Sequence, residues 1–484
     1  MSAAGSTPAT TEQGHRPRRN IAIWFFGALG GILWGYDTGV IGGALLFIGR
    51  DIRLGPLVEG MVVSGLLLGA MIGALSAGRL SDSLGRKKLI VSGSIVFVIG
   101  TIGAALSVNA PMLIAFRLVI GLGVGIVSVV VPMYLSELAP KHIRGGLSSL
   151  MQLMVTTGIF VAYLVDFAFS GGGLWRWMIG LGVVPAALLF VGILTQPESP
   201  RWLIGAHDRV RDADARARET LTRLRGSEQA ADAEIEEIKQ SVAKEEAETQ
   251  PLRLTDLLAP RLRLLFVIGV LLVFFQNWGG INTIIYYAPT LLKNVGFSDQ
   301  QSIIANAAIG LLNMLMTLPA MRLIDRAGRK PLLIFGAAGM CVGMLFLGIT
   351  TLLGLTSGRT SGAIAITLIG IALYIASFAI SWGPVQWVML PELYPLRIRA
   401  GAMGICTTLN WLFNLAVALL FPSLLAKFGA GPNFLFFALT TLLALIFAWR
   451  LLPETKGKSL EEIEAQLSLG GDGQRIGEAA SSRS

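Results

Sequence analysis

The sequence is poor in charge, cysteine and histidine. Asp, Glu, Lys and Arg make up 14% of the 484 residues, whereas a soluble globular domain is about a quarter charged. The two cysteines, Cys341 and Cys406, lie in apolar stretches and indicate no disulfide framework. The histidines, His15, His142 and His207, all lie outside such stretches. The composition therefore excludes an ordinary soluble enzyme and a histidine relay inside a membrane.

Motifs of catalysis are missing as well. The sequence contains no glycine-rich nucleotide loop, no residues at metal-ligand spacing and no pattern of a catalytic triad. Nothing in it points to ATP hydrolysis. We therefore expect a protein that is not an enzyme and that needs neither a cofactor nor a metal ion for its function.

Long apolar runs are abundant. Hydrophobic residues make up 53% of the chain, and runs of about 20 apolar residues match the thickness of a bilayer core. We predict an all-α membrane protein with twelve transmembrane helices in two six-helix bundles. The expected spans are residues 21–48, 57–79, 88–107, 111–133, 146–169, 174–195, 262–291, 300–322, 331–355, 362–390, 400–425 and 432–451.

The basic residues indicate the orientation of these spans. The net charge of +9 would raise the question of nucleic acid in a soluble protein, but here Lys and Arg gather in loops 79–88, 139–145, 322–330 and 396–399. Cytoplasmic loops carry such an excess. We therefore expect no nucleic-acid partner, a multi-pass protein in the lipid bilayer of the plasma membrane, and both termini in the cytoplasm.

A charged segment separates the two sets of spans. Within it, Ile235, Ile238 and Val242 recur at helical spacing, which favours short amphipathic helices at 208–225 and 231–246 over a disordered linker. The expected organisation is a cytoplasmic tail at 1–20, an N-terminal bundle at 21–196, a cytoplasmic linker with short helices at 197–261, a C-terminal bundle at 262–452 and a cytoplasmic tail at 453–484.

The two halves repeat each other in sequence. The Asp-x-x-Gly-Arg loop at Asp82 and Arg86 returns at Asp325 and Arg329. Two further elements repeat at similar offsets: Glu137 with Arg144 returns as Glu392 with Arg399, and Pro197-Glu198-Ser199 returns as Pro453-Glu454-Thr455. Transporters built from matching halves bind their substrate at the interface of the halves, near the middle of the bilayer.

These motifs carry a resemblance to a known family. The chain resembles the sugar porters of the major facilitator superfamily over nearly its whole length, and it looks closest to bacterial proton-coupled pentose and hexose symporters. The Asp-x-x-Gly-Arg loops indicate only the superfamily, whereas Pro-Glu-Ser-Pro-Arg and Pro-Glu-Thr-Lys-Gly are far more specific. The matching segments are residues 35–39, 78–87, 117–123, 132–137, 197–201, 280–282, 321–330 and 453–457.

The resemblance implies the major facilitator fold, alternating access and import of a monosaccharide together with a proton by a functional monomer. Carboxamides suit neighbouring sugar hydroxyls because each offers a donor and an acceptor, and Trp offers a flat face to the ring. Any one amide can equally be helix–helix glue, but the set favours binding. The family's sugar positions fall at Gln152, Gln276, Asn277, Asn282, Asn313, Trp387, Asn410 and Trp411.

Two departures from the family pattern accompany these residues. Met321 stands where the second loop motif usually has Gly, and Asn277 stands where the family usually has Gln. In the same region, Gln276 and Asn282 lie six residues apart, so a straight helix would not present both on one face. We expect the Gly279-Gly280 pair and Pro289 to offer a break in this span that brings them together.

Asp37 is the sharpest single candidate, because an ionisable residue well inside a span is a functional site by default. The resemblance implies that it pairs with Arg117 and that proton-coupled members have this pair, while facilitative relatives have a neutral residue in place of the acid. We therefore expect Asp37 and Arg117 to couple protons to transport. The alternative is a static structural ion pair.

The resemblance also implies two gates. Tyr286 and Tyr287 would close over the sugar from the extracellular side, unless they only belong to an interfacial aromatic belt. On the cytoplasmic side, charged residues would pair across the two halves in the outward-open state, although the placement of positive charge inside explains many of them equally. These residues are Asp82, Arg86, Glu137, Arg144, Glu198, Arg201, Asp325, Arg329, Glu392, Arg399 and Glu454.

Other functions remain open from the sequence. A passive sugar uniporter or a sugar sensor would lack the proton site that Asp37 and Arg117 indicate. An exporter of apolar drug-like compounds would have a more apolar pocket, or one with acidic residues. Within the symporters, the sequence leaves open whether the substrate is a pentose, a hexose or myo-inositol.

Overall fold

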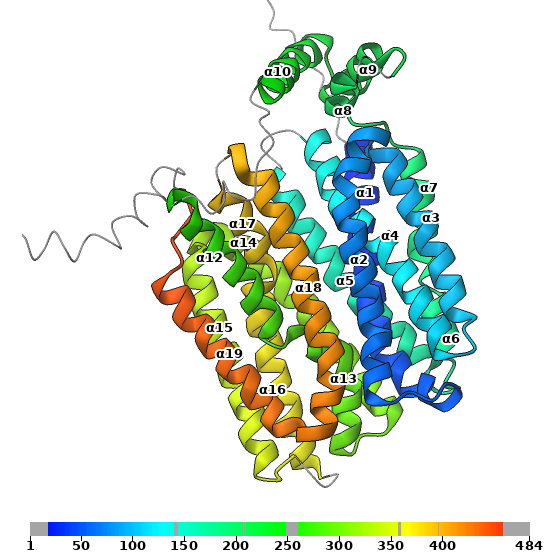
Figure 1. Cartoon of the computed structure of the whole chain (residues 1–484), viewed down its shortest axis with the longest axis vertical. Helices are drawn as coiled ribbons and strands as arrows, with labels where there is room; N and C mark the ends of the chain where they lie inside the picture. Colours follow the sequence, from blue (N-terminus) through cyan, green and yellow to red (C-terminus); the bar gives the residue numbers. More distant parts are fainter. Residues whose placement is uncertain are drawn as a thin grey trace, which may run out of the picture.

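The computed structural model describes residues 18–139, 144–206, 208, 210–247, 260–356, 360–394 and 396–457. Within these ranges all regular secondary structure is helical, and twelve helical segments are long and apolar enough to span a membrane. The predicted fold class is thereby confirmed. Figure 1 shows the spans side by side, with α8, α9 and α10 standing beyond one end of the bundle.

The helices of the N-terminal half are α1 (Arg18–Asp51), α2 (Pro56–Leu84), α3 (Arg86–Ala105), α4 (Ala110–Leu138), α5 (Arg144–Ser170), α6 (Trp175–Gly180) and α7 (Val183–Leu194). Those of the C-terminal half are α12 (Pro260–Trp278), α13 (Ile281–Val295), α14 (Asp299–Ala327), α15 (Arg329–Leu352), α16 (Ser361–Ile380), α17 (Trp382–Leu393), α18 (Leu396–Phe428) and α19 (Ala430–Arg450).

Three helices lie in the linker: α8 (Pro200–Gly205), α9 (Ala213–Arg225) and α10 (Glu228–Ala247). They share a small apolar core that includes Leu203 and Ala217. Arg225 joins them to the bundle, because its guanidinium binds Glu234 at 2.7 Å and donates to the carbonyl of Leu138 at 3.2 Å. We call the end of the bundle next to these helices the linker face, and the opposite end the far face.

One span is broken where the sequence suggested. Gly280 separates α12 from α13 and has φ of +95°, a conformation that an L residue rarely adopts. A Cβ atom there would also lie 2.8 Å from the ring of Phe437. The expected break therefore falls at Gly279-Gly280, whereas Pro289 lies inside α13. A second break lies between α16 and α17 at Ser381, two residues before the Gly383-Pro384 pair.

Glycines bring the helices of the N-terminal half into close contact. Gly65, Gly69 and Gly73 of α2 face α4, where a Cβ atom on Gly69 would lie 2.0 Å from the carbonyl oxygen of Leu118. Small residues at this spacing allow backbones in a membrane to approach each other. The helices α1 and α5 meet in the same way, at Gly35 and its neighbours.

The two halves meet most closely near the far face. A Cβ atom on Gly60 of α2 would lie 2.3 Å from the carbonyl oxygen of Leu419 in α18. Arg50, in the last turn of α1, binds Asp299, in the first turn of α14, at 2.6 Å. These contacts between the halves close the far face.

The first prediction concerns this close packing. Gly69→Ala should lower the free energy of unfolding by about 1–3 kcal/mol, because the added methyl group overpacks the contact of α2 with α4. Thermal denaturation of the purified protein in detergent measures the effect. Gly78→Ala on the same helix is the matched control, since nothing lies within 4 Å of a Cβ atom there. Equal melting temperatures for the two variants would contradict the proposed packing.

Candidate functional site

A cavity lies between the two halves. The empty space inside it, which includes space open to solvent, is about 660 Å³. Of the eight predicted sugar residues, seven line it: Gln152, Gln276, Asn277, Asn282, Asn313, Trp387 and Asn410. They come from α5, α12, α13, α14, α17 and α18, so the cavity is built by both halves.

The break between α12 and α13 organises the amides on one side of the cavity. Asn282, just after the break, donates to the side-chain oxygen of Asn277 at 3.0 Å. Asn277 in turn donates to the side-chain oxygen of Asn410 at 2.8 Å and to the carbonyl of Val273 at 2.9 Å. This chain holds α12, α13 and α18 together and fixes the orientation of the amide groups before any ligand binds.

Trp411 differs from the other predicted residues because it does not line the cavity. It is 2% exposed, and its ring packs against that of Trp34 with centroids 5.3 Å apart. Trp34 does line the cavity, so it presents the flat apolar face that the sequence analysis assigned to Trp411. We interpret Trp411 as the support of that face.

The sequence analysis also missed other lining residues: Thr38, Val155, Thr156, Ile159, Ile281, Ile285, Phe378, Gly383 and Asn414. Helical spacing could have found some of them. Asn414 lies one turn after Asn410, and Thr38 lies one turn after Trp34, which places each pair on one helix face. The apolar members carry no signal that distinguishes them from ordinary core residues.

The two tyrosines predicted for the extracellular gate occupy different places. Tyr286 lines the cavity, and its hydroxyl accepts a hydrogen bond from Asn414 at 3.4 Å. Tyr287 is 1% exposed and donates to the carbonyl of Ala418 in α18 at 2.9 Å. Tyr286 can therefore contact a ligand in the cavity, whereas Tyr287 attaches α13 to α18.

Asp37 and Arg117 meet inside the N-terminal half. One guanidinium nitrogen of Arg117 donates to both carboxylate oxygens of Asp37, at 2.8 and 2.9 Å. The side chain of Asp37 is 4% exposed and that of Arg117 is 1% exposed. Arg117 also donates to the carbonyl of Val62 at 3.2 Å. The pair thus joins α1, α4 and α2, directly beside Thr38 of the cavity wall.

A second buried acid lies in the same half. Asp166 of α5 is fully buried, and neither of its carboxylate oxygens has a hydrogen-bond partner in the described part of the chain. It packs against α1, where a Cβ atom on Gly43 would lie 2.3 Å from its oxygen. Asp166 therefore resembles Asp37 in burial but has no arginine as a partner.

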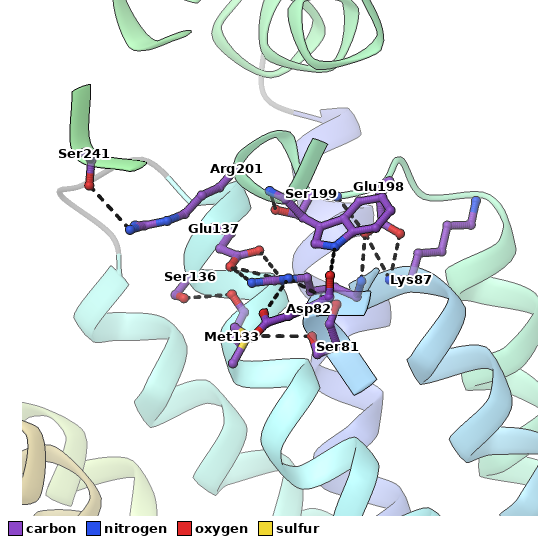
Figure 2. Close-up of polar contacts among 12 residues, drawn as sticks. Ser81, Asp82, Lys87, Met133, Ser136, Glu137, Glu198, Ser199, Arg201 and Ser241 are labelled. Carbon is purple, nitrogen blue, oxygen red and sulfur yellow. Dashed lines mark hydrogen bonds and ion pairs between the residues drawn. The ribbon is translucent and has the colours of Figure 1, made fainter. Parts of the chain in front are cut away.

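Charged residues predicted for the cytoplasmic gate gather at the linker face of the N-terminal half. Arg86 binds Glu137 at 3.0 Å and Asp82 at 3.2 Å. Glu198 accepts hydrogen bonds from the backbone N–H groups of Arg86 and Lys87. Figure 2 shows these acids together at the ends of the helices. Burial raises the pKa of the Glu198 carboxyl, while its hydrogen bonds and Arg86 act in the opposite direction.

The C-terminal half repeats this arrangement. Arg329 binds Glu392 at 2.8 Å and Asp325 at 3.5 Å, and Glu454 accepts from the backbone N–H of Arg329 at 3.0 Å. Arg399 instead donates to the carbonyl of Tyr394. The predicted gate residues thus form two similar clusters, one in each half.

Two arginines of the predicted gate remain. Arg201 reaches Ser241 of α10 at 3.4 Å, as Figure 2 shows, so it connects the N-terminal cluster to the linker helices. Arg144 begins α5, but its side chain lies outside the described residues.

Comparison with known proteins identifies the family. A family model described as "Sugar (and other) transporter" matches residues 23–467. The chain belongs to this family. It is 43% identical to the glucose transporter GlcP of Staphylococcus epidermidis, over 92% of this chain and 96% of the relative. It is 38% identical to the galactose–proton symporter of Escherichia coli, over 97% and 99% of the two chains.

Solved structures agree with this membership. The xylose transporter XylE of E. coli in an inward-open conformation is 31% identical and has a TM-score of 0.78, over 92% of this chain and 99% of that chain. The expected resemblance to sugar porters of the major facilitator superfamily is therefore confirmed. The protein is a multi-pass membrane transporter of this fold.

The second prediction tests the cavity of this sugar transporter. Gln276→Ala should weaken monosaccharide binding by about 1–3 kcal/mol, roughly 5- to 150-fold, because it leaves sugar hydroxyls unpaired in a desolvated site. Titration of the detergent-solubilised protein with a panel of pentoses and hexoses measures the affinity.

Asn433→Ala is the control for that experiment. The amide nitrogen of Asn433 donates to the backbone carbonyls of Leu424, near the end of α18, at 3.2 Å and of Gly429, just before α19, at 2.6 Å. This variant should lose stability and keep its affinity. Unchanged affinity in Gln276→Ala and in Asn282→Ala together would exclude the cavity as the sugar site.

Proposed function

We propose that this protein imports a monosaccharide, a pentose or a hexose, together with a proton across the plasma membrane by alternating access. The observation that carries the proposal is the buried Asp37–Arg117 pair beside the amide-lined cavity between the halves. The relatives, a glucose transporter and a galactose–proton symporter, support a sugar as substrate and a proton as coupling ion. One chain alone builds the cavity, which supports a functional monomer.

The chemistry of the cavity suits a sugar. Its polar lining consists of neutral amides and hydroxyls, such as those of Gln152, Asn282 and Thr156, and such groups both donate and accept hydrogen bonds. Trp34 and Trp387 offer apolar ring faces. No Asp, Glu, Lys or Arg is among the described lining residues. This argues against a cationic or anionic substrate, and the number of amides argues against an apolar drug.

The proton acts on Asp37 in this mechanism. The ion pair needs the carboxylate, because both oxygens accept hydrogen bonds from the same arginine. Protonation removes the charge that compensates Arg117 and so releases α1 from α4. A proton shifts a conformational equilibrium only if the two states differ in their affinity for it. We infer that the paired arrangement of Asp37 and Arg117 belongs to the deprotonated form and follows proton release.

The orientation follows from the basic loops and the linker. We propose that the linker face is cytoplasmic and the far face extracellular, with both termini in the cytoplasm. The contacts of Arg50 with Asp299 and of Gly60 with α18 then close the outside. Similarity to an inward-open structure supports the assignment of this conformation to the inward-facing state.

The third prediction concerns coupling. Asp37→Asn should abolish accumulation of sugar against its gradient, because a neutral amide cannot exchange a proton. Sugar binding and counterflow should survive, since the lining amides are untouched. The measurement is uptake of labelled sugar into proteoliposomes with an imposed pH gradient. Asp166→Asn is the matched control, because it neutralises an equally buried acid that has no arginine partner, and it should still accumulate sugar.

Other outcomes of that experiment are also informative. A static ion pair predicts that Asp37→Asn lowers stability, by leaving Arg117 uncompensated, without changing the ratio of accumulation to counterflow. Continued accumulation in Asp37→Asn would exclude it as the coupling site. A wild-type protein that equilibrates sugars but never concentrates them would favour a uniporter.

The fourth prediction concerns the cytoplasmic gate. We propose that the two clusters at the linker face bind each other in the outward-facing state. Replacing Glu137 and Arg329 by Gln should then increase the inward-facing population, because the outward-facing state alone loses contacts between the halves. Distances between spin labels on the linker-face ends of α4 and α15 report the population. An unchanged distribution would leave these charges with a topological role only.

A further inference from the structure

A second, smaller cavity adjoins the sugar cavity. It lies between α5, α13, α14 and α16, has an empty volume of about 210 Å³, and shares Ile159, Ile285 and Asn313 with the larger cavity. Its own polar residues are Tyr163 and Asn306. The two cavities therefore have a common wall, and a ligand that passed this wall would enter the sugar cavity.

The second cavity lies on the far-face side of the first. The helix α14 starts at Asp299, which binds Arg50 at the far face. Asn306 lies seven residues after Asp299 and seven before Asn313, so it is roughly 10 Å from each along the helix axis at about 1.5 Å per residue. In the proposed orientation this cavity lies between the sugar cavity and the outside.

Not all of its polar groups are paired within the described part of the chain. Asn306 is 2% exposed, and within the described part of the chain its side-chain oxygen has no hydrogen-bond partner. Its side chain also interacts with the hydroxyl of Tyr163, which donates to the carbonyl of Ile285 at 3.1 Å. A buried, unpaired amide oxygen is costly in a membrane protein, so this one needs an explanation.

Opening of the far face would change this cavity, because residues from both halves line it. Tyr163 belongs to the N-terminal half, whereas Gly310, Asn306 and Ile285 belong to the other. The ring of Tyr163 now fills the position that a Cβ atom on Gly310 would need, at 2.6 Å. Separation of the halves therefore removes the ring from α14 and breaks the bond to Ile285. A hydroxyl, an amide and a free carbonyl would then line one widened space.

We propose that Tyr163 and Asn306 form an outer subsite, which binds hydroxyl groups of the incoming monosaccharide in the outward-facing state, before the sugar moves inward to Asn313 and the larger cavity. The proposal rests on the proposed function and orientation. Closure of the far face collapses the subsite, so that it takes no part in sugar binding from the cytoplasmic side.

A one-sided effect on sugar affinity tests the subsite. The variant is Asn306→Leu, which has a similar shape and no amide. The expected result is an increase of about tenfold in KM for sugar supplied from outside, measured in right-side-out vesicles. The Kd for sugar at the inward-facing protein, measured in inside-out vesicles, should stay the same. Tyr163→Phe, which keeps the ring against Gly310 and removes only the hydroxyl, should act in the same direction.

Asn313→Leu is the matched control on the same helix, because Asn313 lines both cavities and should change affinity from both sides. An equal change on both sides in Asn306→Leu, or a loss of melting temperature with unchanged KM, would identify Asn306 as helix–helix glue and overturn the subsite. Unchanged KM and stability in both variants would overturn it too. A wild-type protein that moves no monosaccharide would refute the proposed function itself.

Discussion

The buried pair of Asp37 and Arg117 is the interaction on which the rest of the structure depends. Two opposite charges in a membrane interior are tolerated because each neutralises the other, and the loss of either charge leaves the other one uncompensated. The pair also ties α1 to α4, and Arg117 ties α4 to the backbone of α2 at Val62. The same helices, α1 and α2, contact the other half closely at Gly42 and Gly60. The charge on one carboxyl is thus connected to the contacts that close the far face.

The sequence predicts much of this arrangement because its main determinants are local. Apolar runs define the spans, and a glycine pair marks the break that orients Asn277 and Asn282. An acid and an arginine that both lie deep in apolar runs are expected to pair with each other. Other features depend on neighbours that are distant in sequence. Trp34 and Asn306 look like ordinary members of a span. Their roles follow only from what packs against them.

The charged clusters show a further limit of sequence reasoning. The repeated motifs indicate which acids and bases act together, and the structure brings Arg86 to Glu137 and Arg329 to Glu392. A pairing across the halves, as expected for an outward-open state, belongs to a different conformation of the same chain. One sequence encodes both arrangements, so the choice between them depends on the proton, the sugar and small differences in free energy.

Those differences are small for a physical reason. In this structure each of these arginines already has a carboxylate partner in its own half, so a change to partners across the halves would replace one set of ion pairs with another. The far face is held by a more exposed pair, Arg50 with Asp299, and exposed pairs contribute only about 0–1 kcal/mol each. Neither the ion pairs at the linker face nor the pair at the far face can therefore dominate the equilibrium between the two conformations. Protonation of Asp37 removes a desolvated pair, whose loss is worth several kcal/mol. In the proposed mechanism this buried pair, and not the more numerous charges at the surface, therefore determines which face is open.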